Sequence, residues 1–144
     1  MASQIVVEEF ARLAVGYDPA RGAEHVADAF ARAQARIVGY GEAHRAATPG
    51  WHAGTTAVVA VLVDDNGVTK WLLANLGDSR IYRLTEGRLE QVSFDHSVVQ
   101  ELIDAGEITQ EQAAVHPERH VITRALGSPE GIAPDFFLLP LGSV

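Results

Sequence analysis

Residues 71–84, WLLANLGDSRIYRL, decide the fold of this chain. Two apolar, β-rich runs stand at the ends of the stretch and flank a short polar turn, a pattern that predicts two strands. Gly77 lies in the turn, where a residue without a Cβ lets the backbone bend without steric cost. The turn therefore places Asp78 and Arg80 together at the end of a strand.

The polar turn allows more than one chemical interpretation. A carboxylate beside a guanidinium can bind a hard cation, position a phosphate, or form a local ion pair. Aspartate and glycine are also ordinary turn residues, so a purely structural turn is an alternative. For Arg80 we favour the structural role, as partner of Asp78 or of another carboxylate at a strand end.

The neighbouring residues predict an antiparallel sheet. Residues 55–63 are almost all apolar, which is typical of a strand covered on both faces. Asn66-Gly67 is a strong signal for a tight hairpin. Four strands are expected in an antiparallel meander, at residues 55–63, 68–76, 80–84 and 89–93.

Two amphipathic helices precede the sheet. Apolar residues recur at helical spacing in residues 3–14 and again from residue 19 to about residue 44. Asp18 followed by Pro19 suits the start of the second helix. Each helix has one apolar face, and we expect both to pack on the sheet.

The pattern changes after the fourth strand. Residues 97–105 predict a short helix, whose start we expect His96 to cap together with its two neighbours. Thr109 opens a capping-box pattern for another short helix, which Pro117 ends. Short and weakly apolar helices of this kind are typical of an excursion from the sheet. A last strand is expected from Phe136.

Composition and charge exclude several classes of function. A length of 144 residues predicts one domain, and a net charge of −8 argues against a nucleic-acid partner. No run of about 18 apolar residues is present, so we expect no membrane span. The absence of cysteine and of a secretory signal favours the cytoplasm.

Four motifs occur in the order found in one known family. They are Gly54-Thr55-Thr56, the turn around Asp78, Asp95-His96-Ser97, and residues 121–127, VITRALG. In this order the chain resembles the bacterial metal-dependent protein serine/threonine phosphatases of type 2C, from Gly54 to Gly127 and more loosely in the preceding helices. The resemblance implies an α+β fold with an antiparallel β-sheet meander and flanking helices, a partial version of the family's αββα sandwich. It also implies that residues 1–144 form a single, incomplete domain in which residues 95–127 are a flap.

The resemblance implies metal chemistry. In the family, Mn²⁺ or Mg²⁺ ions share bridging carboxylates and activate a water that attacks the phosphorus of phosphoserine or phosphothreonine. Asp78 matches the aspartate of the family's Gly-Asp-Ser motif and is the expected metal ligand. The other ligand motifs of the family do not occur here, so no catalytic residue is assigned and the isolated chain is expected to be inactive.

The histidines give one further candidate. His116 lies in the flap and is a candidate substrate contact, with loop packing as the alternative. His116 and His120 have a spacing that zinc sites use, but Pro117 lies between them and no third ligand follows.

Three functions remain to be compared. The first is a phosphatase acting on phosphorylated proteins, represented by an incomplete chain. The second is a non-catalytic pseudophosphatase or interaction module with the same fold, and the third is an unrelated acidic α+β binding domain, which the order of the motifs disfavours. Because the two helices can cover only one face of residues 55–63, we also expect the isolated chain to self-associate or to be only marginally folded.

Overall fold

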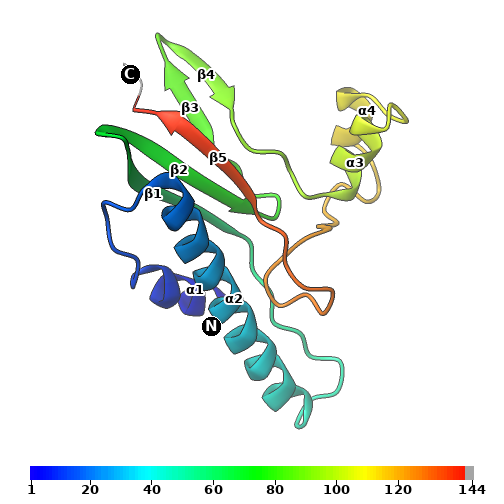
Figure 1. The fold of residues 1–144 in the computed structure, drawn as a ribbon. Coiled ribbons are helices and arrows are strands. Elements are labelled where there is room, and N and C mark those ends of the chain that lie inside the picture. The colour runs from blue at the N-terminus through cyan, green and yellow to red at the C-terminus, as the bar shows by residue number, and fades with distance from the viewer. Residues whose placement is uncertain (142–144) are drawn as a thin grey trace.

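The computed structural model describes residues 1–141 and has an α+β fold, as predicted. Figure 1 shows that two helices lie on one face of a sheet and that a pair of short helices projects away from the sheet. The elements are α1 (Ala2–Phe10), α2 (Pro19–Arg45), β1 (Ala57–Asp65), β2 (Val68–Leu76), β3 (Tyr82–Thr85), β4 (Arg88–Gln91), α3 (Val98–Asp104), α4 (Gln110–Ala114) and β5 (Asp135–Pro140).

The helix α2 begins where the sequence predicts. The Asp18 side chain accepts a hydrogen bond of 3.0 Å from the backbone N–H of Arg21, and Pro19 occupies the first turn. Both features stabilise a helix start, because they satisfy or remove backbone donors that have no partner within the helix. The buried stripe of α2 then faces the sheet and comprises Gly22, Val26, Ala29, Phe30, Ala33, Ile37 and Gly41.

The core lies between α2 and the hairpin of β1 and β2. Phe30 and Ile37 from the helix and Leu76 from β2 are completely buried. The ring of Phe10 in α1 packs edge-to-face against Phe30, with 4.9 Å between ring centroids. Burying such a side chain stabilises a fold by about 1.5–3 kcal/mol, so this cluster fixes how the helices sit on the sheet.

The predicted hairpin is confirmed. Residues Asp65 and Val68 pair at its end, and Asn66 and Gly67 have φ angles of 54° and 84°. Both turn residues therefore adopt the left-handed conformation that a two-residue hairpin turn requires.

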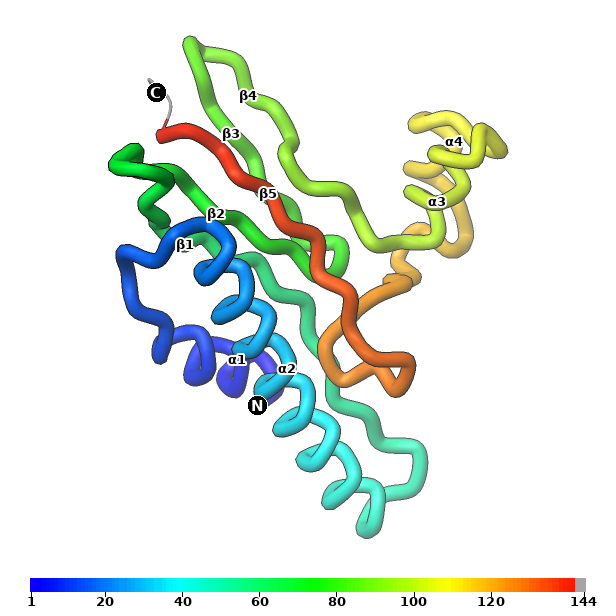
Figure 2. The backbone as a smooth tube through the Cα atoms, viewed as in Figure 1, coloured from blue at the N-terminus to red at the C-terminus, as the bar shows by residue number. Residues whose placement is uncertain are grey.

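The sheet differs from one continuous meander. The strand β5 pairs with β2 and gives the order β1-β2-β5, while β3 and β4 form a separate two-stranded sheet. The chain leaves the first sheet after β2, and β5 then occupies the edge of β2 (Figure 2). Two of the three hairpin pairings of the predicted meander are present, β1 with β2 and β3 with β4, but β3 does not pair with β2.

The strand β1 is covered on one face only by the described residues. Val61 and Val63 face α2 and are buried, whereas Val58 on the opposite face is 47% exposed. We call this opposite face the outer face; it carries Val58, Ala60, Leu62, Trp71 and Leu73. The hairpin of β3 and β4 approaches part of it across a groove of about 390 Å³. The predicted cover on both faces is therefore not supplied by residues 1–141.

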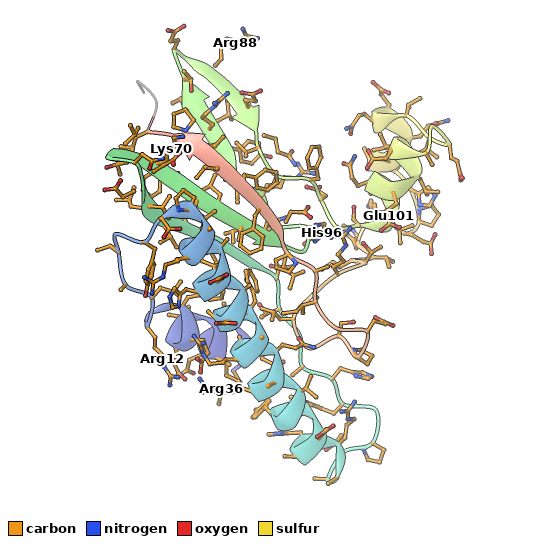
Figure 3. The ribbon with its side chains drawn as sticks, viewed as in Figure 1. Arg12, Arg36, Lys70, Arg88, His96 and Glu101 are labelled. Carbon is orange, nitrogen blue, oxygen red and sulfur yellow. The ribbon has the colours of Figure 1, made fainter. Side chains whose placement is uncertain are left out.

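Charge holds α1 against α2. The carboxylate of Glu9 is only 1% exposed and accepts hydrogen bonds from Arg12, Arg32 and Arg36, at 3.1, 3.0 and 2.8 Å. Figure 3 shows Arg12 and Arg36 gathered beside α1. The bond from Arg36, followed by that from Arg32, holds the pKa of Glu9 below its ordinary value, although burial acts in the opposite direction.

None of the helices within residues 1–141 combines the length and the hydrophobicity that crossing a membrane requires.

Replacing Glu9 is expected to change how stability depends on pH. A carboxyl group whose pKa is lower in the folded state stabilises the fold at neutral pH, and this contribution disappears as pH falls through the folded-state pKa. We expect Glu9→Gln to lower the melting temperature at pH 7, and the difference from the wild type to narrow as pH falls from about 5 towards about 3. Thermal melts at several pH values measure it.

Glu8→Gln is the matched control for this experiment. The Glu8 side chain is 46% exposed and pairs with Arg36 alone. Its replacement is expected to have the smaller effect, because exposed ion pairs stabilise little. If the difference in melting temperature between Glu9→Gln and the wild type is the same at every pH, the Glu9 carboxylate does not contribute to stability in the way described.

Candidate functional site

The turn after β2 is held rigidly. Gly77 has a φ of 110°, and a Cβ at this position would lie 2.3 Å from the Cγ2 atom of Thr56. The Gly77 N–H donates to Nδ1 of His96 at 3.0 Å, and the Gly77 carbonyl accepts from the backbone N–H of His96 at 3.0 Å and from the Asn75 side chain at 3.2 Å. Only glycine fits here, and both of its backbone polar groups are satisfied.

Asp78 follows this rigid residue and lies in a groove. Its side chain is partly buried and makes no hydrogen bond or ion pair with any residue in 1–141. The groove has a volume of about 340 Å³ and runs between the turn and the two short helices. Its lining includes Asp78, Arg80, Asp95, Ser97, Gln100, Arg119 and His120.

Arg80 pairs with Asp95 and not with Asp78. Its Nε atom lies 2.9 and 3.0 Å from the two carboxylate oxygens of Asp95, and its Nη2 atom also donates to this carboxylate. These hydrogen bonds stabilise the charged guanidinium and raise the pKa of Arg80 above its ordinary value. The pair ties the turn after β2 to the beginning of segment 95–127.

His96 has a different role from the one expected. Ser97 alone caps α3, through a 3.3 Å hydrogen bond that its Oγ accepts from the N–H of Gln100. The His96 ring is instead buried, with 4% exposed, and its Nε2 atom lies 2.8 Å from Oδ2 of Asp135 at the start of β5. Asp135 also receives a long hydrogen bond from Arg124, at 3.4 Å.

Sequence reasoning missed the pair of His96 and Asp135. The two residues are 39 positions apart and meet only because β5 pairs with β2. The register places Asp135 opposite Asn75, two residues before Gly77. The sequence offered one signal for this pair: His96 belongs to Asp95-His96-Ser97, one of the four motifs that carry the family resemblance.

Segment 95–127 is closed at its base. The backbones of Thr55 and Leu126 exchange two hydrogen bonds, of 3.1 and 2.9 Å, and Ser97 pairs with Ile122. The predicted capping box of α4 is confirmed, since Thr109 and Gln112 bond reciprocally at 2.8 and 3.2 Å. Figure 2 shows α3 and α4 standing away from the sheet on this closed base.

His116 lies in the turn that follows α4. Its Nδ1 atom accepts a hydrogen bond of 3.1 Å from the backbone N–H of Glu118. The groove beside Asp78 is lined by His120 and not by His116. The geometry therefore supports loop packing for one side of the His116 ring.

The described residues do not form a binuclear metal centre by themselves. Across residues 1–141, no group of three or more histidine, aspartate or glutamate side chains could hold an ion. Asp78 offers one carboxylate without a protein partner, whereas a binuclear centre for hard cations needs several converging oxygen ligands.

The family of this chain is clear from comparison with known proteins. Residues 4–102 match the family model described as Protein phosphatase 2C, and the chain belongs to this family. It is 40% identical over 82 residues to a putative protein phosphatase 2C-type from Streptococcus pyogenes, a match that covers 57% of this chain and 32% of that protein. The chain thus matches about a third of the length of this curated relative.

Solved structures show the same fold. The S. agalactiae serine/threonine phosphatase superposes with a TM-score of 0.84 and 26% identity, over 98% of this chain and 56% of that one. The catalytic domain of the serine threonine protein phosphatase PstP, described in complex with two manganese ions, gives a TM-score of 0.70 and 28% identity, over 96% and 54% of the two chains. The predicted fold class and family are confirmed.

Removing the Arg80 side chain is expected to destabilise the fold. Arg80→Ala leaves the Asp95 side chain, which is 9% exposed, without its ion-pair partner and with the hydrogen bond from the Gln91 amide at 3.0 Å. We expect a loss of about 1–2 kcal/mol in the free energy of unfolding, because hydrogen bonds to charged groups are stronger than neutral ones. Half of the Arg80 side chain is exposed, which keeps the loss below that of a fully buried pair. Urea unfolding measures it.

Arg83→Ala is the matched control for Arg80→Ala. Arg83 forms an exposed pair with Glu90 at 2.6 Å, and its removal is expected to cost about 0–0.5 kcal/mol. Equal losses for the two variants would show that the pair of Arg80 and Asp95 contributes no more than an ordinary surface pair.

Proposed function

We propose that this chain is part of a metal-dependent protein phosphatase that hydrolyses phosphoserine and phosphothreonine in proteins. Membership of the protein phosphatase 2C family supports this class of reaction. The observation that supports a role for these residues is the Asp78 carboxylate, which sits beside a rigid turn, faces a groove and has no partner within residues 1–141. The matches to about a third or a half of the relatives' lengths support the central part of such a domain, with residues 95–127 as its flap.

Asp78 is the proposed metal ligand, for Mn²⁺ or Mg²⁺. Both ions prefer oxygen ligands, and an unpaired carboxylate on a rigid turn can bind one without first breaking an ion pair. When bound, such an ion polarises phosphoryl oxygens and lowers the pKa of a bound water. Because the described residues supply one carboxylate, the remaining ligands of a binuclear centre must come from elsewhere.

The proposed substrates are phosphorylated proteins. The groove beside Asp78 presents Arg119, His120 and Gln100, which can donate hydrogen bonds to phosphate or peptide oxygens. His116 is a proposed substrate contact through Nε2, because the hydrogen bond from Glu118 occupies only Nδ1. We also propose a cytoplasmic location, where phosphorylated proteins are available.

The second candidate function is a pseudophosphatase or interaction module with the same fold. No group of three metal-binding side chains occurs within residues 1–141, which fits this function and an incomplete phosphatase alike. The genomic sequence on either side of this chain separates the two functions. Coding sequence for the family's Asp-Gly-Met-Gly-Gly turn upstream and Ser-Asp-Gly motif downstream would support the phosphatase, and their absence would support the pseudophosphatase.

Metal binding by Asp78 can be separated from turnover in one preparation. We expect Mn²⁺ to broaden the amide signals around Asp78 in NMR spectra of the ¹⁵N-labelled chain, with weak affinity because a single carboxylate binds the ion. Hydrolysis of p-nitrophenyl phosphate with millimolar Mn²⁺ is expected to stay near background. Asp78→Asn should remove the broadening, since an amide is a weaker ligand for a hard cation.

Glu24→Gln provides the control for Asp78→Asn. Glu24 is an exposed carboxylate on α2, so this variant changes the charge equally and should keep the broadening around Asp78. Broadening that is unchanged in Asp78→Asn would remove Asp78 as a ligand. Manganese-dependent turnover that Asp78→Asn abolishes would show that this chain completes a metal centre.

Self-association of the chain is proposed from the outer face. Val58 and Trp71 are 47% and 38% exposed there, and β1 lies at the edge of its sheet. Leaving a few hundred Å² of apolar surface in water forfeits several kcal/mol at about 25 cal/mol per Å². We expect sedimentation at micromolar concentration to show dimers or larger species, and Trp71→Thr to shift the distribution towards monomer.

Val115→Thr is the control for Trp71→Thr. Val115 is 78% exposed and follows α4. It is distant in sequence from the strands that form the outer face, and it does not line either of the two grooves that adjoin this face. A compact wild-type monomer would contradict the proposed association.

A further inference from the structure

We infer that His96 is a positioning residue: as a neutral imidazole with its proton on Nε2, it fixes the turn that carries Asp78 relative to segment 95–127. The inference deepens the proposed function, because it rests on Asp78 as the metal ligand. Figure 3 shows His96 at the junction between the sheet and the projecting pair of short helices.

The hydrogen bonds define the tautomer of His96. The Gly77 backbone N–H can only donate, so Nδ1, 3.0 Å away, must accept and carry no proton. In a neutral ring the proton is then on Nε2, which donates to Oδ2 of Asp135 at 2.8 Å. The charged groups that face the ring are the carboxylate of Asp135 and the guanidinium of Arg124, whose Nη1 lies 3.4 Å from Nε2.

The same residue also fixes the carbonyl of Gly77. The backbone N–H of His96 donates to this oxygen, and the side chain of Asn75 donates to it as well. The peptide unit that leads into Asp78 therefore has its direction set by His96, while the Asp78 carboxylate remains unpaired. Gly77 has no room to move towards Thr56, because the Thr56 side chain lies so close that an added Cβ at Gly77 would be 2.3 Å from its Cγ2 atom.

The connection from His96 reaches segment 95–127 at both of its ends. The carbonyl of His96 accepts a 2.9 Å hydrogen bond from the N–H of Thr123, near the end of the segment. Its two neighbours make contacts at the beginning of the segment: Asp95 forms an ion pair with Arg80, and Ser97 caps α3. A displaced His96 ring would therefore move the Asp78 turn and the base of the segment together.

Two substitutions separate the two hydrogen bonds of the ring. The side-chain amide of His96→Asn takes the place of Nδ1, so it can accept from Gly77 but cannot reach Asp135. The longer amide of His96→Gln takes the place of Nε2, so it can donate to Asp135 but offers Gly77 no acceptor. His44→Asn, at the exposed end of α2, is the control.

The test uses NMR on the full chain with three measurements. Long-range ¹H–¹⁵N spectra of the wild type report the tautomer directly and should show the proton of His96 on Nε2. Amide exchange at Gly77 should be about 10-fold faster in His96→Gln and unchanged in His96→Asn, because only His96→Gln removes the acceptor of the Gly77 N–H. Mn²⁺ affinity at Asp78 should fall about 10-fold in His96→Gln, the size expected for a group that orients a ligand, and by less than about 3-fold in His96→Asn.

The three measurements also show which idea fails. A proton on Nδ1, or unchanged Gly77 exchange in a folded His96→Gln variant, would overturn the positioning role. Equal losses of Mn²⁺ affinity in the two variants would overturn it too, because a merely structural histidine would lower both alike. If the wild type shows no broadening at Asp78, the proposed metal ligand is wrong, and the tautomer together with Gly77 exchange decides whether His96 positions the turn. If neither variant folds, the wild-type tautomer decides alone.

Discussion

The packing of α2 across the hairpin of β1 and β2 is the contact on which the rest of the structure depends. Phe30 and Ile37 fill the space above the sheet, and Gly22 lets the helix approach so closely that a Cβ there would lie 2.8 Å from Val63. The same helix reaches the far end of segment 95–127, where Gln34 binds both the N–H of Gly127, at 2.6 Å, and the carbonyl of Ser128, at 2.7 Å. Through these contacts α2 fixes the position of the sheet relative to the base of segment 95–127.

The candidate site forms where three parts of the chain meet. The strand β2 ends before Gly77, β5 begins at Asp135, and His96 lies at the root of the projecting segment. Because the turn leaves the sheet here, its peptide groups need partners other than a neighbouring strand, and His96 and Asn75 supply them. Their polar side chains are buried for this reason, while Asp78 remains directed to the groove.

Local signals in the sequence were sufficient for most of the elements. The hairpin follows from Asn66-Gly67, because few residues tolerate a left-handed turn, and the start of α2 follows from Asp18. Contacts between distant residues could not be predicted in this way. The pairing of β5 with β2 and the bond between His96 and Asp135 join residues that are about 60–70 and 39 positions apart in the sequence, and periodicity carries no information on such contacts. Arg80 could be given a structural role but not its partner, since Asp95 and Asp78 were equally plausible by chemistry alone.

The closed base of segment 95–127 has a consequence for how this protein can vary in evolution. The pairing of Ser97 with Ile122 brings the two ends of the excursion together, so the residues between them form a loop whose closure is already part of the fold. Doubling the length of a flexible loop costs only about 0.6 kcal/mol of closure entropy. Insertions between α3 and α4 can therefore accumulate at almost no cost to the sheet, and homologues can acquire new surface there while the turn at Gly77, which accepts only glycine, stays fixed.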